Sequence, residues 1–199
     1  MCKKLIVIGA SGHGRVVAEA ATDAGFEVIG FLDDNRELEN VLGGIELIEK
    51  YKDSACFVIA IGNNDTRKKI AEKNAGVRYA TVIHPRAIVS RSASIGEGSV
   101  VMANAVINAK AEVGAHCIIN TSSVVEHDCK LADYVHVSPS AALSGTVEVG
   151  ECTHIGTGAS VRNNLSIAAS SVIGVGAAVV KNIESSGVYC GVPARKLVK

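Results

Sequence analysis

Aromatic residues are scarce in this chain of 199 residues: they make up 4% of the sequence and tryptophan is absent, although 48% of the residues are hydrophobic. Such a composition does not suit a wide core built on large aromatic rings. It favours a narrow interior filled by Ile, Val and Ala. Lysine plus arginine equals aspartate plus glutamate, at 20 each. The net charge therefore gives no indication of a nucleic-acid partner or of an anionic membrane surface.

Long apolar runs are also missing, because charged residues and glycines interrupt every window of the roughly 18 to 20 residues that a membrane span needs. The N-terminal apolar run ends in a glycine-rich turn and has no cleavage-site pattern. We therefore expect a cytoplasmic protein with no membrane insertion. No CxxC pair is present, so we expect the cysteines to be reduced packing residues without a disulfide or metal role. They are Cys2, Cys56, Cys117, Cys129, Cys152 and Cys190.

An unbroken six-residue repeat runs from residue 83 to residue 184. Aliphatic residues occupy every sixth position from Ile83 to Val179, which is 16 steps of six with no residue inserted or missing. Four places after most of them comes a small residue, such as Ala87, Ser99 or Cys117. A period of six matches neither an α-helix, with about 3.6 residues per turn, nor an ordinary strand, with a period of about 2.

Short strands joined by tight corners fit this period, and three such units form one triangular coil of a parallel β-helix. The aliphatic residue points into the prism, and the small residue fits where two walls converge. Coils of this kind bury their apolar faces only by stacking, so they are stable only together. A β-sandwich would need irregular turns roughly every 8 to 12 residues, and we therefore disfavour it.

The first eighty residues have a different pattern, in which short aliphatic strands alternate with helical spacing. We predict strands over residues 3–9, 27–32 and 55–61, one helix that ends before Gly25, and a second helix over residues 65–74. This order is typical of a small Rossmann-like α/β unit. We therefore divide the chain into a Rossmann-like domain of residues 1–80 and a β-helix of residues 81–199.

The turn after the first strand is rich in glycine, since residues 9–14 read Gly-Ala-Ser-Gly-His-Gly. Glycines between a strand and a helix let the backbone approach a phosphate, and the helix N-terminus supplies free N–H groups. Asp33, at the tip of the next strand, can accept a hydrogen bond from a ribose hydroxyl. Together they indicate a nucleotide diphosphate, although glycines that only pack the turn are an alternative. At about 80 residues, the unit is too short for a whole dinucleotide in the usual two halves.

Positions three hexads apart stack on one edge of the prism, which places Gly145 one coil after His127. We expect His127 to be exposed at a corner, beside Asp128 and a bare backbone. An imidazole titrates near neutral pH and a neighbouring carboxylate raises its basicity, so this arrangement fits a general base. A solvated surface pair is the alternative, and spacing alone does not decide between them.

His136 and His154 are also three hexads apart, so both stack on the prism. Together with His127 they could in principle bind zinc, but no further ligand pattern accompanies them. We therefore expect no metal.

Five motifs spread over the full chain are specific in combination. They are Gly-Ala-Ser-Gly-His-Gly at 9–14, Phe-Leu-Asp-Asp at 31–34, Ile-Gly-Asn-Asn at 61–64, Asn-Thr-Ser-Ser-Val-Val-Glu-His-Asp at 120–128 and Gly-Val-Pro-Ala-Arg at 191–195. With these motifs the chain resembles the bacterial PglD and NeuD type acetyltransferases, which join an N-terminal nucleotide-sugar unit to a left-handed hexapeptide β-helix. The last motif alone is typical of many hexapeptide acyltransferases.

The resemblance implies a homotrimer with active sites between subunits, and acetyl transfer from acetyl-CoA to a UDP-linked 4-amino-4,6-dideoxy sugar of the bacillosamine type in glycan biosynthesis. By position, His127 would be the general base and Asp128 would support its basicity, although close relatives usually carry Glu there. The substrate-binding positions would be Ser11, Gly12, His13, Asp33, Asp34, Gly62 and Asn120. The acetyl-CoA-binding positions would be His136, Gly145, Thr157 and Val175, and relatives have Gly at the last of these.

We expect direct transfer, because no cysteine lies in a corner beside His127 to carry an acyl group. Two other interpretations stay open. The chain could be an O-acetyltransferase acting on a sialic-acid-type sugar, or a sugar-nucleotide-binding scaffold without catalysis. The intact His127 and Asp128 pair argues against the scaffold. The base of the nucleotide is not fixed, because backbone groups and Asp33 serve any ribose.

Overall fold

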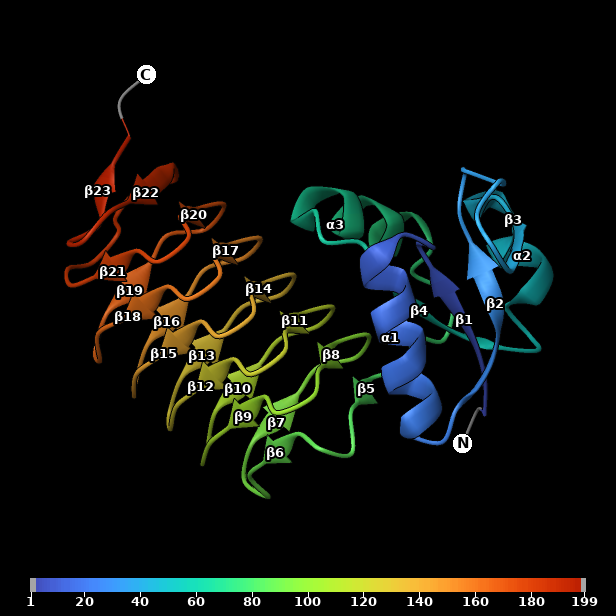
Figure 1. The fold of residues 1–199 in the computed structure, drawn as a ribbon, viewed down its shortest axis with the longest axis horizontal. Coiled ribbons are helices and arrows are strands. Elements are labelled where there is room, and N and C mark those ends of the chain that lie inside the picture. The colour runs from blue at the N-terminus through green and yellow to red at the C-terminus, as the bar shows by residue number, and fades with distance from the viewer. Residues whose placement is uncertain (1–2, 198–199) are drawn as a thin grey trace.

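The computed structural model describes residues 3–197, and in it a small α/β domain is joined to a long three-sided β-solenoid (Figure 1). Both predicted fold classes are therefore confirmed. The division at residue 80 stays a prediction.

Four parallel strands form the sheet of the α/β domain, in the order β3-β2-β1-β4. Its elements are β1 (Lys4–Ile8), α1 (Gly12–Asp23), β2 (Glu27–Leu32), β3 (Val41–Gly43), the 3-10 helix η1 (Ile45–Leu47), α2 (Ile48–Tyr51), β4 (Cys56–Ile59) and α3 (Asn64–Lys73). The sequence does not predict β3, η1 or α2, because each is too short to show a period. The strand order reverses between β1 and β4, and open α/β sheets bind ligands at such a switch point.

Helix α1 lies between this sheet and the solenoid (Figure 1). Its buried residues Val17 and Ala21 share one apolar cluster with Val7 of β1. The same cluster includes Val100 and Ile118 of the solenoid. The α/β domain therefore covers the first coils of one solenoid wall through close apolar packing, whereas Val172 further along that wall is exposed.

The solenoid has about six turns and matches a left-handed β-helix. Strands three hexads apart pair in parallel, as Ile118 does with His136 and His136 with His154. The predicted coil of three hexads is therefore confirmed. The interior is also as predicted, because the aliphatic Val125 and the small Cys129 are both fully buried inside it.

We name the three faces of the solenoid by what covers or lines them. The docked face consists of β5 (Val82–Ile83), β8 (Val100–Val101), β11 (Ile118–Ile119), β14 (His136–Val137), β17 (His154–Ile155), β20 (Val172–Ile173), β22 (Val188–Cys190) and the antiparallel β23 (Arg195–Lys196). The apolar face consists of β6 (Ile88–Val89), β9 (Val106–Ile107), β12 (Val124–Val125), β15 (Ala142–Leu143), β18 (Ser160–Val161) and β21 (Ala178–Val179). The charged face consists of β7 (Ser94–Ile95), β10 (Glu112–Val113), β13 (Lys130–Leu131), β16 (Glu148–Val149) and β19 (Ser166–Ile167).

A left-handed backbone conformation recurs at the fourth place of every hexad from Gly98 to Gly176. The non-glycine residues there have φ between 52° and 61°; they are Asn104, Lys110, His116, Ser122, Asp128, Tyr134, Ser140, Thr146, Cys152, Asn164 and Ser170. This conformation costs roughly 1 to 2 kcal/mol for a residue with a Cβ atom. Coil-to-coil hydrogen bonds offset that cost, as when the Asp128 N–H donates to the Ala109 carbonyl at 3.0 Å.

Four of the cysteines are free thiols, as expected: Cys117, Cys129, Cys152 and Cys190. Cys56 is disulfide-bonded, so the expectation of a reduced thiol is wrong there. A sequence without a CxxC pair does not show which thiols meet in space. Cys2 lies outside the described residues. Within residues 3–197, no helix is long and apolar enough to cross a bilayer.

Candidate active site

The corner between β12 and β13 carries His127 and Asp128. Their side chains are 59% and 49% exposed, and His127 Nδ1 lies 2.8 Å from Asp128 Oδ2. A carboxylate oxygen accepts, so Nδ1 donates in this contact, and in the neutral tautomer with this contact Nε2 carries the lone pair. Asp128 has a φ of 57°, which its short polar side chain tolerates. The corner therefore presents an oriented imidazole to solvent.

Gly145 stands one coil after His127, with its backbone against the imidazole. A Cβ atom at Gly145 would lie 2.5 Å from His127 Cε1 and 2.6 Å from Nε2. The two coils are joined directly, since the Thr146 N–H donates to the His127 carbonyl at 2.9 Å. Any side chain at position 145 would collide with the ring, so glycine is required for the observed position of His127.

The glycines around the turn after β1 are of two kinds. A Cβ atom at Gly9 would lie 2.9 Å from the Ala60 carbonyl oxygen, and one at Gly14 would collide with the Gly9 carbonyl. Gly12 and Gly62 have open space where a Cβ atom would stand. Packing therefore explains Gly9 and Gly14, whereas Gly12 and Gly62 leave the backbone accessible to a ligand.

The N-terminus of α1 has the properties of an anion site. Ser11, in the N-cap position, makes no side-chain cap hydrogen bond, and the first turn holds no acidic residue. Both Ser11 and Gly12 are exposed. Free N–H groups and the positive end of the helix dipole therefore face outward at this switch point.

Asp33 and Asp34 follow β2 at the same edge of the sheet. Asp33 Oδ2 accepts from the Ala10 N–H at 2.8 Å, and its Oδ1 accepts from the Asn35 N–H at 2.9 Å. Asp34 Oδ1 accepts from the Ile45 N–H at 3.3 Å. Asp33 thus shapes the glycine-rich turn itself, a role that the sequence does not predict.

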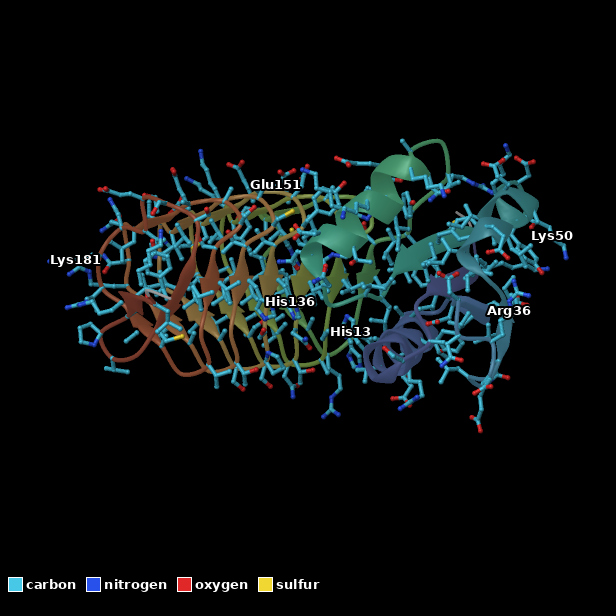
Figure 2. All side chains as sticks on the ribbon, turned by 90° about the horizontal axis from the view of Figure 1, so that it is seen from above. His13, Arg36, Lys50, His136, Glu151 and Lys181 are labelled. Carbon is cyan, nitrogen blue, oxygen red and sulfur yellow. The ribbon has the colours of Figure 1, made fainter. Side chains whose placement is uncertain are left out.

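Three histidines form a row where the α/β domain meets the docked face. The ring centroids of His136 and His154 are 4.6 Å apart, and those of His136 and His13 are 6.4 Å apart. His136 Nε2 lies 3.2 Å from Asn120 Nδ2, and His154 Nε2 lies 2.8 Å from Ser138 Oγ. Figure 2 shows His13 and His136 close together at this junction.

The surroundings keep this row neutral. Burial, followed by the neighbouring His154 and the Arg67 cation, lowers the pKa of His136 to about 3. Burial and then Arg67 also lower the pKa of His13 and of His154. The buried atoms His136 Nδ1 and His13 Nε2 have no hydrogen-bond partner among the described residues. A neutral imidazole donates from one ring nitrogen and accepts at the other, so the row is a set of uncharged hydrogen-bonding groups.

Thr157 and Val175 stack on the corner between the docked and apolar faces. The Gly176 N–H donates to the Thr157 carbonyl at 2.9 Å, which joins the two coils. Val175 is 79% exposed, so this corner faces solvent.

His127 does not meet the histidine row within one chain. His136 lies on the docked face, whereas the corner with His127 joins the apolar and charged faces and is opposite the docked face in the triangular section. The acetyl-CoA positions are divided in the same way, with His136 and Thr157 beside the docked face and Gly145 under His127. Among residues 3–197, no group of three or more His, Cys, Asp or Glu side chains is arranged to hold a metal ion.

Comparison with known proteins places the chain. The family model of the PglD N-terminal domain matches residues 4–74. The acetyltransferase domain of PglB from Neisseria gonorrhoeae is 41% identical in sequence and superposes with a TM-score of 0.93 over 98% of this chain and 100% of its own. The chain belongs to the PglD-type hexapeptide-repeat acetyltransferase family.

Two further proteins are similar to this PglD-type chain. PerB from Caulobacter crescentus, solved in complex with CoA and GDP-perosamine, is 35% identical, with a TM-score of 0.94 over 98% of this chain and 97% of its own. UDP-N-acetylbacillosamine N-acetyltransferase from Bacillus subtilis is 43% identical over an alignment of 104 residues, with 45% of this chain and 46% of that protein covered. The chain thus matches less than half the length of this curated relative.

Arg67 is the residue of the PglD-type chain that sequence reasoning misses. It stands in the charged run Arg-Lys-Lys of α3 and is only 1% exposed. Its guanidinium donates to the carbonyl groups of Ile61, His116 and Tyr134. The signal that could have found it is helical spacing, because the buried residues Asn64, Arg67 and Ala71 share one face of α3.

Proposed function

We propose that this chain transfers the acetyl group of acetyl-CoA to the amino group of a UDP-linked 4-amino-4,6-dideoxy sugar. The observation that carries the proposal is the 2.8 Å contact between His127 Nδ1 and Asp128 Oδ2, which orients an exposed imidazole. Family membership supports the acyl donor, because the PglB domain was also solved with acetyl-CoA and PerB with CoA.

His127 acts as the general base in this proposal. The sugar nitrogen attacks the thioester carbonyl, its proton passes to His127 Nε2, the C–N bond forms, and CoA leaves as the C–S bond breaks. The proton then returns to the departing thiolate. Cys129 is close in sequence but fully buried inside the solenoid, so it cannot carry the acetyl group and the transfer is direct. The neutral His136 can donate a hydrogen bond to the oxygen that develops negative charge.

A second copy of the chain completes the site, because His127 and the docked face lie on opposite sides of one solenoid. The outward residues of the apolar face suit an interface between copies: they are Ile88, Val106, Val124, Ala142, Ser160 and Ala178. The matching residues of the charged face suit water: they are Ser94, Glu112, Lys130, Glu148 and Ser166. Three solenoids that pack through apolar faces form a closed homotrimer, with each His127 beside a neighbouring chain.

The nucleotide binds at the switch point between β1 and β4. The diphosphate meets the N-terminus of α1 at Ser11, Gly12 and His13, with Gly62 on the other side. A hollow of about 620 Å³ between η1 and α3 has the volume of a ligand site, and Asp34 is the proposed substrate residue that lines it. UDP is our choice of nucleotide, and the GDP-perosamine complex of PerB makes GDP its direct competitor.

An acceptor screen tests the function. Purified protein is mixed with acetyl-CoA and one of three acceptors, a UDP-linked 4-amino sugar, a GDP-linked 4-amino sugar or sialic acid, and free CoA thiol is measured. We expect thiol release with the UDP-linked amine and a sequential kinetic pattern. Release with sialic acid alone would indicate an O-acetyltransferase, and no release with any acceptor would indicate a binding scaffold.

His127→Ala supplies the matched control. It should lose most of kcat, because the proton acceptor is gone, while the protein keeps its fold at this exposed corner. Near wild-type kcat in this variant, or a ping-pong pattern in the wild-type protein, would contradict the proposed mechanism.

A further inference from the structure

Three backbone carbonyl groups stack on the edge between the charged and docked faces. They belong to His116, Tyr134 and Cys152, which follow one another at intervals of one coil and occupy the left-handed fourth place of their hexads. The N–H group of each residue bonds to the preceding coil, as the Tyr134 N–H does to the Ala115 carbonyl at 2.9 Å. The three carbonyl oxygens accept from side chains of α3. The edge therefore presents a column of acceptors to the α/β domain.

Arg67 connects this column to the loop that precedes α3. Its Nε donates to the His116 carbonyl at 2.8 Å, and its Nη2 donates to the Tyr134 carbonyl at 2.7 Å. Nη1 donates to the Ile61 carbonyl at 2.8 Å, and Nη2 also donates to Asn64 Oδ1 at 2.8 Å. One side chain thus joins two coils of the solenoid to the turn that follows β4.

Asn64 extends the same contact by one coil, because its Nδ2 donates to the Cys152 carbonyl at 2.9 Å. The first turn of α3 therefore contacts three successive coils through Asn64 and Arg67. Lys68 Nζ lies 2.7 Å from Glu151 Oε2 and adds an ion pair across the same junction, but it does not contact the loop.

The Arg67 guanidinium is buried without a carboxylate beside it. Burial lowers its pKa to about 10, so it stays charged at neutral pH. Its hydrogen bonds to backbone carbonyls compensate the charge, and removing it would leave those acceptors buried and unsatisfied. A lysine keeps the charge but has no planar fork, so it cannot reach the same acceptors together.

We propose that Arg67 is a positioning residue for the nucleotide site. It holds the loop at residues 61–62 against two coils and so fixes the separation between Gly62, which has open space for a ligand, and His136 on the docked face. The proposal rests on the nucleotide-binding role proposed above for this loop. The junction between the domains would then contribute to nucleotide binding as well as to the stability of the fold.

A purely structural role predicts something different. If the junction only stabilised the protein, losing Arg67 and losing the Lys68 ion pair would both lower the melting temperature and leave ligand affinity unchanged. Lys68→Met is therefore the matched control, because it weakens the same junction without touching residues 61–62.

The test uses calorimetric titration of the full chain with UDP, GDP and acetyl-CoA as separate probes, together with thermal unfolding. We expect Arg67→Met and Arg67→Lys to weaken binding of the preferred nucleotide at least about tenfold, since small displacements of a site have effects of this size. Binding of acetyl-CoA should stay near that of the wild-type protein. Asn64→Ala, which keeps the Ile61 contact, should have a smaller effect and serves if Arg67→Met does not fold.

Wild-type nucleotide affinity in Arg67→Lys, with a melting temperature lowered as in Lys68→Met, would overturn the proposal. A wild-type protein that binds neither UDP nor GDP would overturn it as well. The acceptor screen distinguishes this failure from a failure of the proposed function. If the wild-type protein releases thiol in that screen, the proposed acetyl transfer stands and only the positioning role of Arg67 is refuted.

Discussion

Gly145→Ala gives the sharpest test of the catalytic corner. The added Cβ atom would stand 2.5 Å from His127 Cε1, whereas ordinary contact begins at 3.4 Å. The imidazole must therefore move by about 0.9 Å, or the corner backbone must shift by a similar amount. A displacement of about 1 Å at a reacting group can lower the rate about 100-fold, which corresponds to about 3 kcal/mol of activation free energy.

The fold should tolerate this change. The His127 side chain is 59% exposed, so the ring can rotate away from the new methyl group without opening the core. Gly145 is buried beneath this ring, but the three atoms nearest to the new methyl group all belong to the exposed His127 side chain, which can move aside. We therefore expect kcat to fall about 100-fold while the thermal unfolding curve stays close to that of the wild-type protein.

Steady-state thiol release measures the loss, and a double-mutant cycle supplies the control. In a His127→Ala background there is no ring for the methyl group to displace, so Gly145→Ala should have no further effect on kcat. Equal losses in both backgrounds would mean that Gly145 acts through something other than His127, and wild-type kcat in the single variant would refute the reasoning.

Three more predictions test separate parts of the molecule. Asp128→Asn removes the carboxylate but keeps a residue that tolerates the left-handed φ. We expect kcat to fall by about 10- to 100-fold with the KM for acetyl-CoA unchanged. A kcat equal to that of the wild-type protein would exclude Asp128 from orienting the base. Stability should fall as the pH drops from 6.5 towards 3, because His136 binds a proton in the unfolded chain but not when it is buried in the folded chain. The free energy of unfolding, measured with denaturant, should decrease by up to about 5 kcal/mol over this range, and by less in His136→Asn. A free energy of unfolding that does not change with pH would contradict the lowered pKa. Val124→Asp on the apolar face should give monomers in sedimentation and no thiol release. Lys130→Asp on the charged face should stay assembled. The reverse result would show that the charged face, and not the apolar face, forms the interface.

The solenoid is predictable from the sequence because its period is visible in almost every hexad. The aliphatic position recurs without a break and most hexads also hold a small residue, so the register that stacks Gly145 on His127 follows by counting. The same counting pairs His136 with His154. The backbone of each corner repeats the geometry of the corner before it, so the position of every corner residue is also predictable.

The docking of the α/β domain is not predictable in this way. The helical spacing of Asn64, Arg67 and Ala71 marks a buried face of α3, but the acceptors of Arg67 are backbone carbonyls that the sequence does not identify. The ring contact between His13 and His136 joins residues far apart in the sequence and likewise follows no period. The outward residues of the hexads differ between the three faces, being apolar on one and charged on another. This difference is visible in the sequence only when the hexads are sorted by face.

The column of corner carbonyls has a consequence for how such proteins can change in length. Docking uses His116, Tyr134 and Cys152, so the coils that hold these residues must keep their order relative to α3. Coils after them contribute no acceptor to Asn64 or Arg67. Addition or loss of one whole coil beyond this column would keep every side chain on its face, whereas a single-residue change would turn the inward residues outward. Growth of the solenoid is therefore restricted to whole coils at the end away from the α/β domain.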